Sequence, residues 1–341
     1  MLIDKTNVDN CSPNYFVIFN YDLPTKCIIS KNITLHPYHV ENPIGMTILH
    51  DVMIAEVNFT DDEIPDEYRT GFFSTSQYFS RDQLEIFLAC MQISNQPSNE
   101  KKNIFNFLED SNNKPYEILG LYETFPVGIL SNSQPIFGFK DSTSVSENFF
   151  SNHNSIIDTV VNSSFYQFGF PFLYLISPTH ISNSIEFYKK VQSITNKKNT
   201  KNEKETSRLL QNILLTYYKS KIDDTIVSIS SSISIIESMF GAPENITMSI
   251  QERVPKYLGY GSEKLSKILR KMYDIRSVNA HLKYSHQFSS NPDLHYFYDN
   301  KRLISSLTTI LIEKWVDEIF NGKTRTEFRT SIIDDEKYSK K

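Results

Sequence analysis

The 341-residue sequence contains few cysteines, and the three that it has follow no pattern. Cys11, Cys27 and Cys90 make neither a disulfide framework nor a Cys-x-x-Cys metal knuckle, which favours a reducing compartment. His36 and His39 stand on either side of a proline, which rules out the helical i, i+4 spacing of many zinc sites. We interpret these histidines as surface or packing residues, and we expect no metal and no cofactor.

The sequence also lacks a long hydrophobic run. Its longest apolar stretch, Phe168 to Ile176, is interrupted by a glycine and a proline and is far shorter than the ~20 residues of a membrane-spanning helix. Asp4 and Lys5 break the apolar character of the N-terminus, so no secretion signal is visible. We therefore expect a cytoplasmic protein with no membrane partner.

An excess of positive charge is the third feature that is missing. The formal net charge is -5, which argues against a protein coated for nonspecific nucleic-acid binding. The charge is unevenly distributed, however, because Glu252 to Lys283 holds eight Lys and Arg against three Asp and Glu. This basic stretch is either an RNA-binding surface or an ordinary solvated helix face, and the sequence leaves both open.

Hydrophobic residues make up 39% of the chain and charged residues 22%, as in a globular protein of about two domains. Residues 1–195 combine expected strands at Tyr15–Tyr21, Cys27–Leu35 and Thr47–Phe59 with a capped helix that begins at Ser80. A polar loop is expected at residues 95–103, and further strands at residues 116–122 and 136–139. We predict an α+β N-terminal domain there, with a sensing or regulatory role. Aromatic residues are plentiful in it, and we interpret them as core.

The C-terminal part is predicted to be helical throughout. A polar, charged stretch at residues 196–207 is expected to be a linker, and residues 208–322 alternate helical periodicity with Gly and Pro breaks. Several helices in so short a segment predict an all-α bundle. Residues 323–341 are expected to be a polar, frayed tail.

One predicted helix carries the residues with the most chemistry. Lys264 to Tyr284 has apolar residues in a 3-then-4 rhythm, and Arg276 and His281 lie five positions apart near its end. Arginine can clamp a phosphate with two parallel hydrogen bonds, and histidine can move a proton near neutral pH. An arginine and a histidine together supply half of the groups that an active site needs to cleave a phosphodiester. The alternative is an arginine in a surface salt bridge and a histidine that caps a packed helix.

The surroundings of this pair resemble the HEPN superfamily, and within it the group called ApeA-like HEPN. Three pieces match in the family's order: a helix ending in SIIESMFG at residues 234–241, the segment IQERV at residues 250–254, and MYDIRSVNAH at residues 272–281. The last piece follows the family's pattern of Tyr, Asp, x, Arg, Ser, three variable positions and His. The resemblance covers roughly residues 205 to 322.

The resemblance implies a HEPN-like helical bundle that dimerises and acts as a metal-independent endoribonuclease, many such proteins being toxins or antiphage effectors. Arg276 and His281 would then be catalytic, with Asn279 as a helper, and the products would carry 2′,3′-cyclic phosphate and 5′-hydroxyl ends. Lys271, Ser277 and Lys283 are the expected substrate-binding residues. The alternative function is a non-catalytic dimerisation or binding module with a ligand-sensing N-terminal domain.

Two further expectations concern the geometry of the pair. At about 100° per residue, five steps place the two side chains about 140° apart, so we expect a homodimer that brings two copies of the helix to one RNA-binding cleft. Glu237, inside the first matching piece, has two open roles. It either orients Arg276 or pairs with a lysine in a structural contact.

Overall fold

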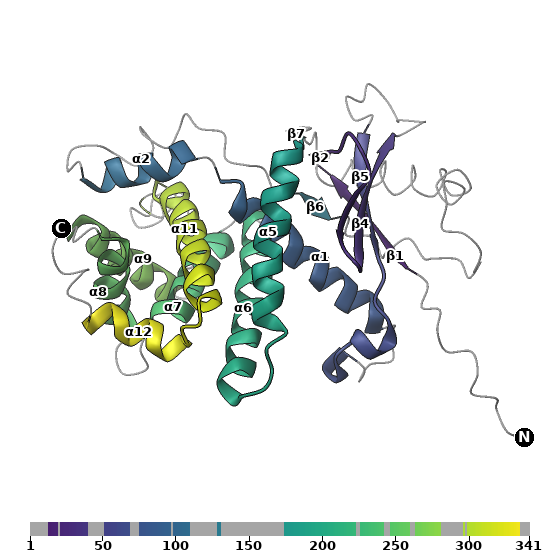
Figure 1. Ribbon diagram of the computed structural model, residues 1–341. Helices are drawn as coiled ribbons and strands as arrows, with labels where there is room; N and C mark the ends of the chain where they lie inside the picture. Colours follow the sequence, from purple (N-terminus) through teal and green to yellow (C-terminus); the bar gives the residue numbers. More distant parts are fainter. Residues whose placement is uncertain are drawn as a thin grey trace, which may run out of the picture. The chain divides into compact units, whose positions relative to one another are not determined.

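The computed structural model describes residues 13–19, 21–39, 51–68, 75–96, 98–109, 128–130, 174–222, 226–241, 246–259, 263–280, 296 and 299–334. Contacts divide the chain into two compact units. The first is drawn from residues 1–88 and 126–185, and the second from residues 89–125 and 186–341. In Figure 1 the strands near the N-terminus are purple, and most helices of the second unit run from teal through green to yellow.

The first unit contains a five-stranded antiparallel sheet with the strand order β3-β4-β5-β1-β6. Its strands are β1 (Asn14–Phe19), β3 (Cys27–Ser30), β4 (Ile33–His39), β5 (Asp51–Val57) and β6 (Ile129–Leu130). A separate parallel pair joins β2 (Tyr21–Asp22) to β7 (Tyr174–Leu175). The sheet contains strands in the three regions where they were expected, but the expected strand Cys27–Leu35 is divided by a turn at Lys31 and Asn32 into the antiparallel pair β3 and β4. Two short 3-10 helices, η1 (Asp61–Glu63) and η2 (Asp66–Tyr68), follow β5.

Two central strands form the core of the sheet. All residues from Tyr15 to Phe19 in β1 are buried, and so are Val52 to Ala55 in β5. Burial of consecutive residues, instead of every second residue, means that both faces of these strands are covered. The strong β-branched and aromatic content of the two segments suits such a position.

The β4 strand tolerates a proline because of where its neighbour ends. Pro37 pairs with Met53 of β5, whereas β3 pairs only with Ile33 to Leu35 on the other side. Pro37 therefore lies beyond the reach of β3, so its missing N–H costs no bond to that strand. Its neighbour His36 is buried, and its Nε2 lies 2.9 Å from the Glu56 carboxylate. His36 is a packing residue, as its sequence context predicts.

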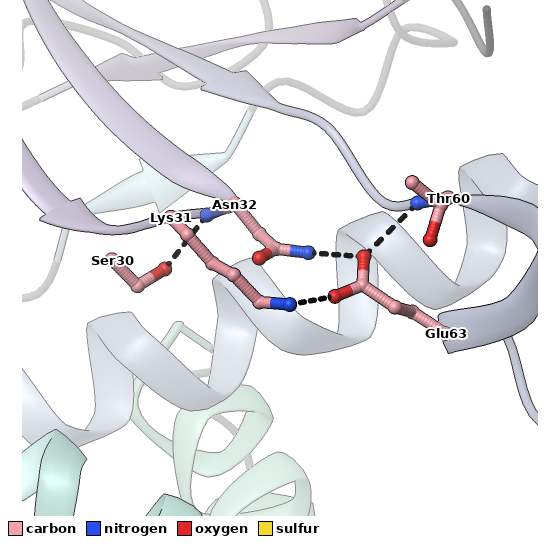
Figure 2. Close-up of polar contacts among 5 residues, drawn as sticks. All are labelled: Ser30, Lys31, Asn32, Thr60 and Glu63. Carbon is pink, nitrogen blue, oxygen red and sulfur yellow. Dashed lines mark hydrogen bonds and ion pairs between the residues drawn. The ribbon is translucent and has the colours of Figure 1, made fainter. Parts of the chain in front are cut away.

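A polar cluster ties the β3–β4 turn to η1, and Figure 2 shows its five residues. Glu63 accepts hydrogen bonds from the Asn32 side chain at 2.7 Å and from the Thr60 backbone N–H at 3.0 Å, and it forms an ion pair with Lys31. Ser30 accepts a bond from the Asn32 backbone N–H. One carboxylate thus holds two segments that are about thirty residues apart in the chain.

The second unit is helical. Its helices are α2 (Ser98–Glu109), the last part of α5 (Pro178–Thr195), α6 (Lys201–Ile222), α7 (Ile226–Phe240), α8 (Ile246–Leu258), α9 (Glu263–Ala280), α11 (Lys301–Phe320) and α12 (Arg325–Asp334). The boundary between the units falls inside α5 and inside α1 (Thr75–Ser94). The compact units therefore differ from the expected boundary at residue 195, because residues 89–125 and 186–195 belong to the helical unit.

The α7 helix is the centre of this unit, since it contacts α6, α8, α9, α11 and α12. Ile229, Ile233, Ile235 and Ile236 of this helix are buried, as are its last residues Met239 and Phe240. The buried Ser228 and Ser232 donate hydrogen bonds to backbone carbonyls of Ser220 and Ser228, so a helix rich in serine carries these hydroxyls into the core at little cost. The largest buried side chain of the unit, Trp315, comes from α11.

The helix expected to begin at Ser80 begins at Thr75 as α1, so Ser80 lies inside the helix and is not its cap. Three further segments differ from the predictions made from the sequence. The expected linker at residues 196–207 is shorter, because α6 begins at Lys201, and the expected tail at residues 323–341 contains α12. Both helices begin with a reciprocal capping box, in which the threonine hydroxyl and the glutamate carboxylate each accept a backbone N–H bond: Thr200 with Glu203, and Thr324 with Glu327.

The third difference is α2, which lies where a polar loop was expected at residues 95–103. The first turn of α2 is charged and polar, as in a loop, but its second half is apolar. Ile104, Phe107 and Leu108 in that half are buried, and the helix packs against α11. The strands expected at residues 116–122 and 136–139 lie outside the described residues. No helix in the described part of the chain is both long and apolar enough to cross a bilayer.

Candidate functional site

The predicted motif helix is present as α9. Leu265, Ile268, Leu269 and Met272 are buried on the side where α9 packs against α8 and α7. Gly259, whose φ of 76° lies in the left-handed region, ends α8 and allows the chain to turn back towards α9. The apolar rhythm of the sequence therefore sets which face of α9 points to the core.

Arg276 lies near the end of the described part of α9 and forms an ion pair with Glu237. The side chains are 25% and 22% exposed, so the pair is partly shielded from water but accessible from one side. Glu237 is the single charged residue among the fifteen of α7. Of the two roles left open for it, the contact with Arg276 is the one that the structure contains.

The ion pair limits where the guanidinium can point. It uses one terminal nitrogen, Nη1, and among the described residues Glu237 is its hydrogen-bond partner. The ring of Tyr273, one helical turn earlier, lies 5.9 Å from the guanidinium carbon, which is at the outer range of a cation–π contact. Both the carboxylate and the ring contact the guanidinium. Among the described residues its Nη2 and Nε have no hydrogen-bond partner, so these two nitrogens can donate to an anion.

The other predicted site residues are distributed as follows. Lys271 is half-buried, and its ammonium lies 4.4 Å from the centre of the Tyr296 ring. It precedes Arg276 by five residues, so the two side chains leave α9 about 140° apart. Ser277 is half-buried next to Arg276, and the backbone of Asn279 continues α9. His281 and Lys283 lie outside the described residues.

Much of the basic stretch has structural partners. Lys264 donates a hydrogen bond to the Phe107 carbonyl at 2.9 Å and lies over its ring, Lys267 pairs with Glu263, and Arg253 donates to the Phe240 carbonyl. Arg270 is exposed on α9. Several of these cations are therefore occupied by contacts within the unit. Fewer of them can bind RNA than the residue count indicates.

The sequence interpretation missed two arginines of α12. Arg325 and Arg329 stand four residues apart, so they share one face of the helix, and both donate hydrogen bonds to the end of α7. Their signal was the Arg-x-x-x-Arg spacing that brackets the apolar Phe328 directly after a capping box. Within the described residues, no group of three or more His, Cys, Asp or Glu side chains is arranged to hold a metal ion.

Comparison with known proteins finds no counterpart for the chain: no protein-family model, no curated protein and no solved structure matches it.

Proposed function

We propose that this protein is a metal-independent endoribonuclease of the HEPN type, acting as a toxin or antiphage effector. The observation that carries the proposal is the Arg276–Glu237 pair, which fixes a partly exposed guanidinium at the end of the helix that also leads to His281. A fixed cation with unused donors is suited to stabilise charge that develops on a phosphate.

The proposed reaction needs only groups of the RNA and of this chain. His281 takes the proton of the ribose 2′-hydroxyl, the oxygen attacks the adjacent phosphorus, and the bond to the 5′-oxygen breaks. The protonated His281 then gives this proton to the leaving 5′-oxygen, which yields a 2′,3′-cyclic phosphate and a 5′-hydroxyl end. Arg276 stabilises the phosphoryl oxygens during the attack, and Asn279 contributes a further hydrogen bond. Lys271, Ser277 and Lys283 bind the RNA backbone, and the α+β unit restrains or triggers the nuclease.

The second candidate function is a non-catalytic HEPN-type dimerisation or binding module with a sensing N-terminal unit. The same ion pair also supports this function, because a carboxylate that neutralises Arg276 gives the arginine a structural role in the packing of α9 on α7. The two functions differ in one measurable respect. Replacement of His281 in a protein that still folds should abolish the activity of a nuclease, but it should leave the activity of a binding module intact.

The decisive experiment measures cleavage of a cellular RNA mixture and of a defined oligonucleotide by the purified protein. His281→Ala is expected to lose at least about 100-fold in rate, and Arg276→Ala a similar amount. Arg276→Lys should retain part of the activity, because lysine keeps the charge but loses the fork. Arg270→Ala, an exposed arginine on the same helix, is the matched control and should cleave normally.

Two readouts test the chemistry of the cleavage. Activity should persist in EDTA, and mass spectrometry of the products should find the cyclic phosphate. Loss of activity on chelation that magnesium or manganese restores would contradict the metal-independent mechanism. Expression in bacteria should slow growth, and His281→Ala should relieve that effect. A folded His281→Ala protein that cleaves as fast as the natural chain would favour the binding module.

A further inference from the structure

Three arginines from two helices meet at the C-terminal end of α7. Arg325 donates to the Ser238 carbonyl at 2.8 Å, and Arg329 donates to the same carbonyl at 2.9 Å and to that of Met239 at 3.1 Å. Arg253 of α8 donates to the Phe240 carbonyl at 2.8 Å. We call Arg253, Arg325 and Arg329 the arginine cluster.

The shared carbonyl sets how close these cations lie. Two terminal nitrogens that bind one oxygen at 2.8 and 2.9 Å are less than about 6 Å apart. The third guanidinium is bonded two residues further along the same helix end. The end of a helix carries only about half a negative charge, which does not balance three positive ones.

Little else in the described residues compensates the cluster. Glu205 acts on Arg325, but this carboxylate is 61% exposed and lies 3.9 Å from Lys201. Burial and then the repulsion of Arg325 and Arg253 lower the pKa of Arg329 to about 10. The Nε of Arg325 is buried and has no hydrogen-bond partner. The cluster therefore has surplus positive charge and unused donors, while all three side chains remain half-exposed.

We propose that the arginine cluster is a binding site for a phosphate dianion, either free inorganic phosphate or the phosphate group of a monoester. A dianion matches the uncompensated charge of the three arginines, and its tetrahedral oxygens can accept hydrogen bonds from several guanidinium groups at once. A single carboxylate carries half that charge and fewer acceptors. A guanidinium already bonded to a helix end is held in place, so binding a phosphate would cost little side-chain ordering.

This site is separate from the proposed cleavage chemistry. RNA cleavage by the 2′-hydroxyl leaves a cyclic phosphate and a 5′-hydroxyl, so it neither needs nor makes a phosphate monoester. The same phosphate chemistry is found in free inorganic phosphate and in a nucleoside 5′-monophosphate. Binding at α7, α8 and α12 together would lock α12 onto the bundle.

The test is isothermal titration of the full chain with inorganic phosphate, adenosine 5′-monophosphate and adenosine, at constant ionic strength held by chloride. We expect phosphate and the monophosphate to bind and adenosine not to bind. Arg325→Gln and Arg329→Gln should each weaken binding at least tenfold. Arg208→Gln, an exposed arginine of α6, is the matched control and should bind normally.

Comparison of the two ligands assigns the source of the phosphate. Tighter binding of the monophosphate supports a nucleotide, and equal affinities support the phosphate group alone as the ligand. The Arg329→Lys variant keeps a positive charge at the helix end, so it is less prone to unfold than Arg329→Gln. Circular dichroism checks that each variant is folded. Arg329→Lys should bind phosphate more weakly than the natural chain. No binding of either ligand at millimolar concentration, or equal binding by the folded Arg325 and Arg329 variants, would overturn the proposal.

Discussion

At the scale of single residues, Glu237 has the most distinctive position. It brings the one charge of α7 to the surface of α9, where it meets Arg276. A carboxylate in such a helix needs a partner, because an unpaired, partly buried charge is costly. One contact therefore has two effects: it orients Arg276, and it neutralises Glu237.

A double-mutant cycle on this pair tests how strongly the two residues are coupled. Glu237→Gln and Arg276→Ala, alone and together, should give an interaction of about 1 kcal/mol in the free energy of unfolding measured in urea. If the pair also orients a catalytic group, Glu237→Gln should lower the rate of RNA cleavage about tenfold, which is equivalent to roughly 1.4 kcal/mol. Additive unfolding energies would show that the two side chains act independently.

Glu63 is a second residue with a measurable electrostatic role. Burial alone would raise its pKa, but hydrogen bonds from Lys31, Thr60 and Asn32 outweigh burial and lower the pKa below its ordinary value. A carboxyl whose pKa is lowered on folding contributes stability above its unfolded pKa, and this contribution is lost as the pH falls through its folded pKa.

Glu63→Gln should therefore destabilise the chain at pH 7 by about 1 kcal/mol, and the difference from the natural chain should shrink as the pH falls below 4.5. Urea unfolding between pH 7 and pH 3, followed by fluorescence, measures both. Asp62→Asn is the control, because Asp62 is an exposed acid of the same short helix. A difference that stays constant over this pH range would mean that the charge of Glu63 contributes nothing.

At the scale of elements, α12 shows how a short helix is fixed to a bundle. Phe328 is fully buried, and its ring lies 5.3 Å from that of Phe240 and 5.1 Å from that of Tyr257. The edge-to-face geometry of both contacts is the favourable one for aromatic rings. On either side of Phe328, Arg325 and Arg329 bind the end of α7.

Truncation of the anchor should release the helix. Phe328→Ala is expected to cost about 3–5 kcal/mol in the free energy of unfolding, because it removes a buried ring and leaves a cavity between two others. Hydrogen exchange followed by mass spectrometry should find the amides of residues 325–334 exchanging faster. Thr326→Ala, an exposed neighbour, should change neither quantity. Slow exchange of α12 in a folded Phe328→Ala protein would assign its docking to the arginines instead.

At the scale of the whole molecule, the proposed nuclease requires more than one chain. Ideal helical geometry separates two positions five residues apart by about 140°, so Arg276 and His281 of a single chain would converge poorly on one phosphate. A two-fold dimer that brings two copies of the helix together supplies an arginine from one protomer and a histidine from the other. We therefore expect a homodimer formed through the helical unit.

Light scattering at micromolar concentration should give twice the chain mass of 39.6 kDa. The sharper test mixes two inactive variants, Arg276→Ala and His281→Ala, under conditions that exchange subunits. Half of the randomly mixed dimers then hold one intact composite site, so the mixture should recover about a quarter of the natural activity. An active protein that remains a monomer, or exchanged dimers with no recovered activity, would exclude the composite site.

The sequence by itself determined the elements whose signal is local. The apolar rhythm from Leu265 to Met272 predicted α9 and its buried face, because burial in an amphipathic helix repeats with the helical period. The strands of the sheet were predicted from runs of β-branched and aromatic residues. Arg276 could be named from its chemistry and its motif. The start of α12 was encoded equally locally, in Thr324 and Glu327, although its polar surroundings hid it.

Only the tertiary structure decided which distant residues meet. Glu237 and Arg276 are 39 positions apart, and Arg325 is 87 positions from the carbonyl that it binds. No local pattern specifies such partners, because each pairing depends on how α9 and α12 pack against α7 and on which carbonyls the end of α7 leaves unbonded. The packing of the helices thus selected the partner of Glu237, and it gathered three arginines at a single helix end.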